Sequence, residues 1–184
     1  MTDRSAAEIH IGGKIPRSVA QTLCTVITKS GASLEWGGGW CRMNTPDELL
    51  LARSADTGGL LVLKLYDDQA RGGEFQALEK FLQEHGIPYC RWTEGNSDYD
   101  AEAVAFHPQS GQLSWLTDRN QYPIVLASQL APIADALTKL LAEIHGSEVP
   151  SAKLRRKLQR IRGKLQKCLP PIVPALESFE LIGR

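Results

Sequence analysis

The stretch LLVLKLYDDQARGGEFQALEKFLQEHGIPYCRW, residues 60–92, decides the fold of this 184-residue chain. It opens with an apolar run, Leu60–Leu65, interrupted only by Lys64, which is typical of a strand covered on both faces. A polar turn and an amphipathic helix follow, and the apolar positions of the helix are Phe75, Leu78, Phe81 and Leu82. Gly86 is the residue expected in the left-handed conformation after the helix. Residues 87–92 return to strand-forming types, so the stretch predicts a strand, a helix and a second strand.

A weaker version of this pattern comes earlier in the chain. Residues 8–11 indicate a strand, a helix is expected from Pro16 to Ser30, and residues 32–36 indicate another strand. Trp36 and Trp92 fall at equivalent places of the two halves, which favours packing in a shared core. The correspondence predicts an α+β fold built on a ferredoxin-like βαβ pseudo-repeat with a mixed sheet.

Three further segments complete the expected sheet. A short capped helix over residues 45–52 joins the two halves. Residues 103–107, 112–117 and 122–127 indicate three short strands and are separated by turn residues. They predict a β-meander that extends the sheet.

The C-terminal part of the chain is expected to be helical. Pro132 is expected to open one helix, and residues 153–169 form a second, heptad-like helix. Residues 146–151 carry glycine, serine and proline and are the expected linker, and residues 172–176 are expected to be extended. The sequence therefore predicts a core domain over 1–146 and a basic helix with a proline-rich tail over 147–184.

Charge is distributed unevenly along a chain whose formal net charge is zero. Residues 1–150 hold 12 Lys and Arg against 19 Asp and Glu, whereas residues 151–184 hold 9 against 2. Apolar runs fall short of the roughly 18 residues of a membrane helix, and the first residues do not resemble a secretory signal. Four scattered cysteines without a CxxC pair favour reduced thiols. We therefore expect a cytoplasmic protein with no membrane partner.

The basic helix is the main candidate binding site. Like charges four residues apart on it cost about 0.2–0.5 kcal/mol per pair, so an anion is expected to offset them. Nucleic acid is the first candidate, because phosphates bind mainly through Lys and Arg. The chain's own acidic body, an acidic protein surface or a second copy of the chain are the alternatives. The candidate residues are Lys153, Arg155, Arg156, Lys157, Arg160, Arg162, Lys164 and Lys167.

Carboxylates after the first strand of the deciding stretch are a second candidate site. Asp67 and Asp68 are expected where that strand ends, and Glu74 begins the next helix. A Mg²⁺ ion held there with substrate phosphates would support phosphoryl transfer or hydrolysis. Successive strand residues point to opposite faces, so Asp67 and Asp68 can share a metal only if the strand has already ended. Turn and helix-capping roles are the alternative for all three.

Other residue patterns are weaker. Cys90 with His107 or His10 is a conceivable nucleophile and base, although their spacing does not place them together. The four tryptophans are a conceivable stacking platform for single-stranded bases. Glycines 37–39 lack the Gly-Lys-Ser/Thr of a phosphate loop. We therefore expect a small non-enzymatic binding protein without a cofactor, with the Mg²⁺-dependent enzyme and a protein-binding or inhibitor subunit as alternatives.

Overall fold

The chain forms two compact units in the computed structural model, which describes residues 4–56, 58–96, 100–145 and 152–183. Met1–Tyr122 and Ile172–Arg184 make one unit, called here the sheet unit. Pro123–Pro171 makes the other, called the hairpin unit. The boundary expected at residue 146 divides the chain differently, because it leaves the first C-terminal helix with the sheet. Whether residues 1–146 and 147–184 fold as separate domains stays a prediction.

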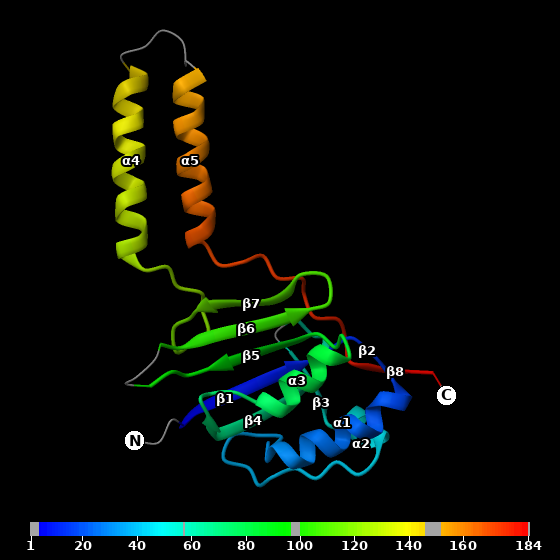
Figure 1. The fold of residues 1–184 in the computed structure, drawn as a ribbon. Coiled ribbons are helices and arrows are strands. Elements are labelled where there is room, and N and C mark those ends of the chain that lie inside the picture. Colours follow the sequence, from blue (N-terminus) through cyan, green and yellow to red (C-terminus); the bar gives the residue numbers. More distant parts are fainter. Residues whose placement is uncertain (1–3, 57, 97–99, 146–151, 184) are drawn as a thin grey trace. The chain divides into compact units, whose positions relative to one another are not determined.

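The sheet unit contains a six-stranded sheet in the order β3-β4-β1-β5-β6-β7 (Figure 1). Every pair of neighbouring strands in it is antiparallel, so the expectation of a mixed sheet is wrong. A separate parallel pair joins β2 to β8. The strands are β1 (Arg4–Ile11), β2 (Lys14–Pro16), β3 (Arg53–Ala55), β4 (Leu61–Arg71), β5 (Tyr89–Thr93), β6 (Glu102–His107), β7 (Gly111–Leu116) and β8 (Glu180–Ile182).

Helices cover one face of this sheet (Figure 1). They are α1 (Arg17–Ser30), α2 (Pro46–Leu51) and α3 (Gln76–Glu84). Strand residues that alternate toward them, such as Ile9 and Leu65, form one core with Leu23 of α1 and Leu82 of α3. Gly86 has a φ of 63°, which confirms the expected left-handed residue after α3.

The strand residues between these core positions point to the other face of the sheet, called here the second face. Glu8 of β1 pairs in register with Tyr66 of β4 and with Trp92 of β5. His10 pairs with Cys90 in the same way.

Three expected strands differ in the structure. β4 continues to Arg71 instead of ending near Tyr66, because β1 pairs with it from Leu63 to Arg71 across a bulge between Ser5 and Ala7. Residues 32–36 make only one bridge, between Ser33 and Tyr66, because a turn begins at Glu35. Residues 122–127 do not form the third strand of a meander.

The C-terminal tail returns to the sheet unit. Phe179 is fully buried in the core, and its backbone N–H donates to the carbonyl of Leu61 at 2.7 Å. The N–H of Gly13 donates to the carbonyl of Glu177 at 3.0 Å. The tail is therefore an integral part of the sheet unit.

The hairpin unit consists of two helices that lie side by side, α4 (Ala127–His145) and α5 (Ala152–Cys168) (Figure 1). Their buried contacts include Ile133 and Leu140 of α4 and Leu154 of α5. α5 matches the expected basic helix, whereas α4 begins before Pro132, which lies inside it. The expected linker lies outside the described residues. None of the described helices has the length and apolar character that crossing a bilayer requires.

Candidate functional sites

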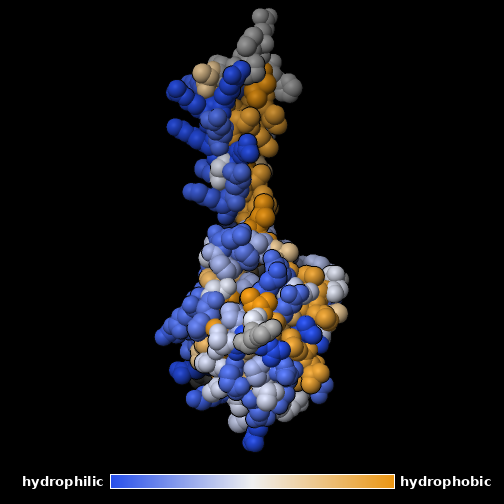
Figure 2. All heavy atoms as spheres, turned by 90° about the vertical axis from the view of Figure 1, so that its right-hand side faces the viewer, coloured by the Kyte–Doolittle hydropathy of each residue, from blue (hydrophilic) through white to orange (hydrophobic). Residues whose placement is uncertain are grey.

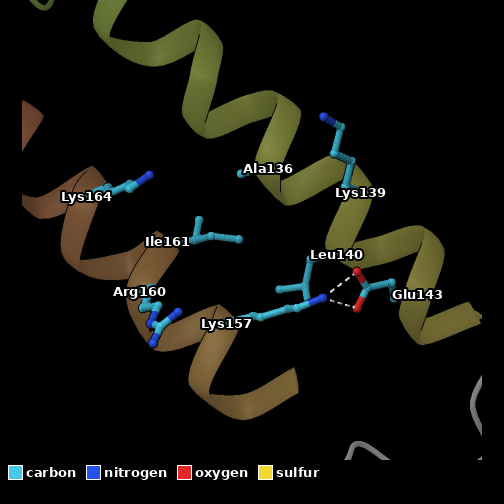
Figure 3. A pocket seen from close by; sticks show the side chains of 8 residues that line it. All are labelled: Ala136, Lys139, Leu140, Glu143, Lys157, Arg160, Ile161 and Lys164. Atoms are coloured by element: carbon cyan, nitrogen blue, oxygen red, sulfur yellow. Dashed lines mark hydrogen bonds and ion pairs between the residues drawn. The ribbon is translucent and has the colours of Figure 1, made fainter. Parts of the chain in front are cut away.

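A basic groove runs between α4 and α5. It has a volume of about 300 Å³, and Figure 3 shows its lining side chains. They are Ala136, Lys139, Leu140, Glu143, Lys157, Arg160, Ile161 and Lys164. Four of these eight residues are cations and one is an acid, and the small and branched apolar residues form the floor. The groove is therefore a positively charged surface with an apolar base.

One ion pair bridges the groove. The Nζ of Lys157 lies 2.5 Å from Oε1 and 2.6 Å from Oε2 of Glu143, and Figure 3 shows the two side chains meeting between the helices. Both side chains are partly exposed, so the pair contributes little to stability. Its main effect is to neutralise one groove cation.

The eight cations predicted as a binding site all lie on α5. Among the described residues of the hairpin unit, Lys157 is the one of the eight in an ion pair, and the other seven are exposed. Arg155 and Arg162 lie on a different side of α5 from Lys157 and Lys164, because a helix turns by 3.6 residues. The structure therefore brings Lys157, Arg160 and Lys164 together with Lys139 of α4, a residue that the sequence did not single out.

A leucine side accompanies the basic groove on the hairpin. The hairpin, in the upper part of Figure 2, carries separate hydrophilic and hydrophobic stripes. The leucine side consists of Leu130, Leu137 and Leu141 of α4 and Leu158 and Leu165 of α5, each more than a third exposed. Two helices bury only the sector where they touch, so the rest of each apolar stripe stays uncovered.

The candidate metal carboxylates do not converge. Asp67 and Asp68 are successive residues inside β4, so their side chains point to opposite faces. Asp67 accepts from the N–H of Gln69 at 2.8 Å, and Asp68 accepts from the N–H of Gly37 at 3.0 Å. Glu74 is exposed and bonds to Gln76. Within the described ranges, no three His, Cys, Asp or Glu residues are grouped so that they could hold a metal ion.

A pocket of about 420 Å³ lies on the second face of the sheet. Its lining residues are Ala6, Glu8, Trp36, Asp68, Trp92, Glu94, Arg119 and Gln121. The ring of Trp36 packs on that of Tyr66, with their centroids 4.9 Å apart and their planes tilted by 56°. Sequence reasoning missed this pocket. The available signal was Glu8 between Ala7 and Ile9, an acid at an interior position of a strand.

Glu8 is the buried charge of this sheet-face pocket. Its Oε1 lies 3.2 Å from Nε2 of His10 and accepts from Nε2 of Gln121 at 2.9 Å. Burial acts to raise the pKa of Glu8, but hydrogen bonds from His10 and Gln121 and the charges of His10 and Lys64 lower it overall. Glu8 is therefore a carboxylate at neutral pH.

The fold brings Cys90 and His10 together, although their spacing in the sequence did not predict this. They are register partners on β5 and β1. However, burial and, secondarily, the charge of Glu8 raise the pKa of the Cys90 thiol to about 11. A protonated thiol is a poor nucleophile, and the Nε2 of His10 is directed to Glu8. This pair is therefore not arranged as a nucleophile and base.

The tryptophans occupy different environments. Trp92 is buried, and its Nε1 donates to Oγ1 of Thr117 at 3.1 Å. Trp36 is 43% exposed and Trp40 is 81% exposed. Trp36 and Trp92 both line the sheet-face pocket and lie outside the main core, so the expectation of shared core packing is wrong.

Compared with known proteins, the chain matches no family model, and neither a curated protein nor a solved structure shows significant similarity to it. Functional inference therefore depends on the basic groove, the leucine side and the sheet-face pocket themselves.

Proposed function

We propose that this is a small, non-enzymatic binding protein whose basic groove contacts a polyanion, with the backbone of a nucleic acid as the first candidate. The observation that carries the proposal is the gathering of Lys139, Lys157, Arg160 and Lys164 along one groove with a single acid, Glu143. Phosphates spaced along a strand offset such a row of cations, and the released counterions favour the complex.

The charge balance of the hairpin unit supports the same proposal. Pro123–Pro171 contains nine Lys and Arg against three Asp and Glu. Like-charged side chains one turn apart, such as Arg156 with Arg160 and Arg160 with Lys164, repel each other on α5. A bound anionic partner offsets this repulsion, so binding should also stabilise the helix.

The proposal is tested by fluorescence anisotropy of labelled single-stranded RNA and duplex DNA at 50, 100 and 200 mM KCl. We expect affinity to fall steeply as salt rises, as it does when several phosphates are neutralised. The double variant Arg160→Gln/Lys164→Gln should bind more weakly and with a shallower salt dependence. The matched control is Lys29→Gln/Lys80→Gln, which removes two exposed cations of α1 and α3. Affinity that ignores salt, or equal losses in both variants, would contradict the proposal.

A protein partner is the second candidate, and the leucine side is the observation that favours it. Leu141 and Leu158 are each 50% exposed, and contiguous apolar surface of this kind often marks a protein interface. We expect Leu141→Gln/Leu158→Gln to change the mass measured by light scattering if a second copy covers this side. An unchanged mass, with polyanion binding retained, would leave the basic groove as the functional surface.

We also infer that the sheet unit is a ferredoxin-like βαβ pseudo-repeat. The order β3-β4-β1-β5, with α1 and α3 on one face, supports this inference. The proposal includes a cytoplasmic location, which the four free cysteines support because reduced thiols are usual there. This fold hosts many functions, so it adds nothing to the case for polyanion binding.

A further inference from the structure

We propose that the sheet-face pocket binds an organic cation, an alkylammonium or alkylguanidinium group, between Trp36 and Trp92 with the carboxylate of Glu8 as its counter-ion. All the residues that line this pocket belong to the sheet unit. The inference is therefore independent of the basic groove and of the proposed function.

The charge of the pocket selects a cation. Glu8, Asp68 and Glu94 line it together with one basic residue, Arg119. Arg119 is exposed, whereas Glu8 is 8% exposed and keeps its negative charge inside the sheet face. A phosphate or carboxylate ligand would meet three acids there, and a positively charged group would meet a surplus of negative charge.

The hydrogen bonds of Glu8 leave one of its oxygens available. Both partners that the structure describes, His10 and Gln121, bond to Oε1. Oε2 accepts no hydrogen bond from the described residues, and it is not among the atoms fully shut off from solvent. Because Oε2 reaches solvent, it keeps acceptor capacity that Oε1 has already used. An N–H group of the ligand can donate to it.

The aromatic walls define the class of cation. Trp92 is the register neighbour of Glu8 on β5, and Tyr66, which supports Trp36, is its neighbour on β4. Aromatic rings attract cations through their negative faces and pack against alkyl groups. A bare metal ion needs several oxygen or nitrogen ligands and gains little from indole rings. An organic cation with an alkyl stem matches both the rings and the carboxylates.

The ligand cation has two possible sources, a free amine or guanidine and the side chain of a Lys or Arg in a peptide. Isothermal titration calorimetry of the 184-residue chain at low salt with five probes separates them. The probes are n-butylammonium, n-butylguanidinium, the neutral isostere n-butanol, and the capped tripeptides Gly-Lys-Gly and Gly-Arg-Gly. We expect the cations to bind and n-butanol to bind at least tenfold more weakly. Tighter binding of a tripeptide assigns the cation to a protein, and equal binding assigns it to a free amine.

Variants locate the binding. Trp36→Leu removes one aromatic wall and should weaken cation binding at least tenfold, whereas Trp40→Leu, at the more exposed tryptophan outside the pocket, should leave it unchanged. Asp68→Asn removes a charge but keeps an acceptor for the N–H of Gly37, and should weaken binding several-fold. Glu8→Gln should abolish it, with thermal unfolding measured alongside to show that the variant is folded.

Indole N–H signals in ¹H–¹⁵N spectra show which tryptophans the bound cation contacts. The signals of Trp36 and Trp92 should shift with n-butylguanidinium, and that of Trp40 should not. Three results would overturn the inference: no binding of either cation at 10 mM, equal binding by wild type and Trp36→Leu, or adenosine monophosphate binding more tightly than the cations. The last result would make the pocket a nucleobase site.

Discussion

Arg91 and Glu79 form a buried ion pair, with Nε of the guanidinium 3.0 Å from Oε1 of the carboxylate. The pair joins β5 to α3. Nη1 of Arg91 also donates to the carbonyl of Gly73 at 2.7 Å, and the hydroxyl of Tyr89 donates to Oε2 of Glu79 at 3.2 Å. Burial and the neighbouring charge of Glu79 raise the pKa of Tyr89, so its hydroxyl stays protonated. This network fixes the turn that leads into α3.

Removing one partner of this pair should strongly destabilise the sheet unit. Arg91→Ala leaves the carboxylate of Glu79 buried without its cation, which costs about 3–5 kcal/mol. Urea unfolding followed by far-UV circular dichroism measures the loss. Lys80→Ala is the control, since it breaks only the exposed pair with Glu84 and should cost less than about 0.5 kcal/mol. Similar values for the two variants would show that the buried network does not hold α3 in place.

Gly73 is the position in this turn where a side chain cannot be accommodated. Its φ is 66°, and an added Cβ would lie 2.1 Å from Oγ1 of Thr93. Gly73→Ala should therefore cost roughly 2–5 kcal/mol, from the left-handed backbone and the clash together. Gly111 has a φ of 72° with open space around it, so Gly111→Ala should cost only about 1–2 kcal/mol. Equal costs in urea unfolding would mean that Thr93 moves aside without penalty.

Local sequence patterns predicted the helices of the sheet unit well. Apolar residues at helical spacing, with Gly31 and Gly86 after the ends, set the bounds of α1 and α3 within a few residues. The extent of β4 was not predictable in this way. Its polar second half, Asp67 to Arg71, resembles a turn and becomes a strand because β1 pairs with it, which is a long-range effect.

The candidate sites differ in how far the sequence revealed them. The cations of α5 stand out because eight of them fall within fifteen residues of one helix. Their partner in the groove, Lys139, and the grouping of Trp36, Glu8 and Arg119 depend on segments that only the folded chain brings together. Asp67 and Asp68 cannot share a metal ion because β4 extends past both of them. The sequence did not predict that length, so this result also required the structure.

Alkaline pH should destabilise the fold through buried thiols. Burial raises the pKa of Cys90 to about 11 from an ordinary value of 9.0, and it also raises those of Cys24 and Cys41. Between pH 9 and 11 the thiol of Cys90 loses its proton in the unfolded chain but keeps it in the folded protein. The free energy of unfolding therefore falls as pH rises through this range, by up to about 1.4 kcal/mol per pH unit from Cys90. The raised pKa values of Cys24 and Cys41 act in the same direction.

The contribution of Cys90 to this pH dependence is isolated by substitution. Urea unfolding at pH 8, 9, 10 and 11 should show a shallower decline for Cys90→Ala than for wild type. Cys168→Ala, at the end of α5, should keep the wild-type decline. A decline that is unchanged in Cys90→Ala would show that its thiol titrates normally in the folded protein.

Glu143 should lower the affinity of the basic groove for a polyanion. Its carboxylate is the acid among the groove residues and neutralises Lys157. Glu143→Gln frees that cation and removes a negative charge, so affinity for labelled RNA at 100 mM KCl should rise about two- to fivefold, the scale of one exposed charge pair. Asp135→Asn makes the same change in net charge at an exposed position of α4 outside the groove, and should alter affinity less. Anisotropy titrations of both variants measure the difference. Equal gains would show that net charge attracts the polyanion, and a weaker complex for Glu143→Gln would show that the phosphates do not enter this groove.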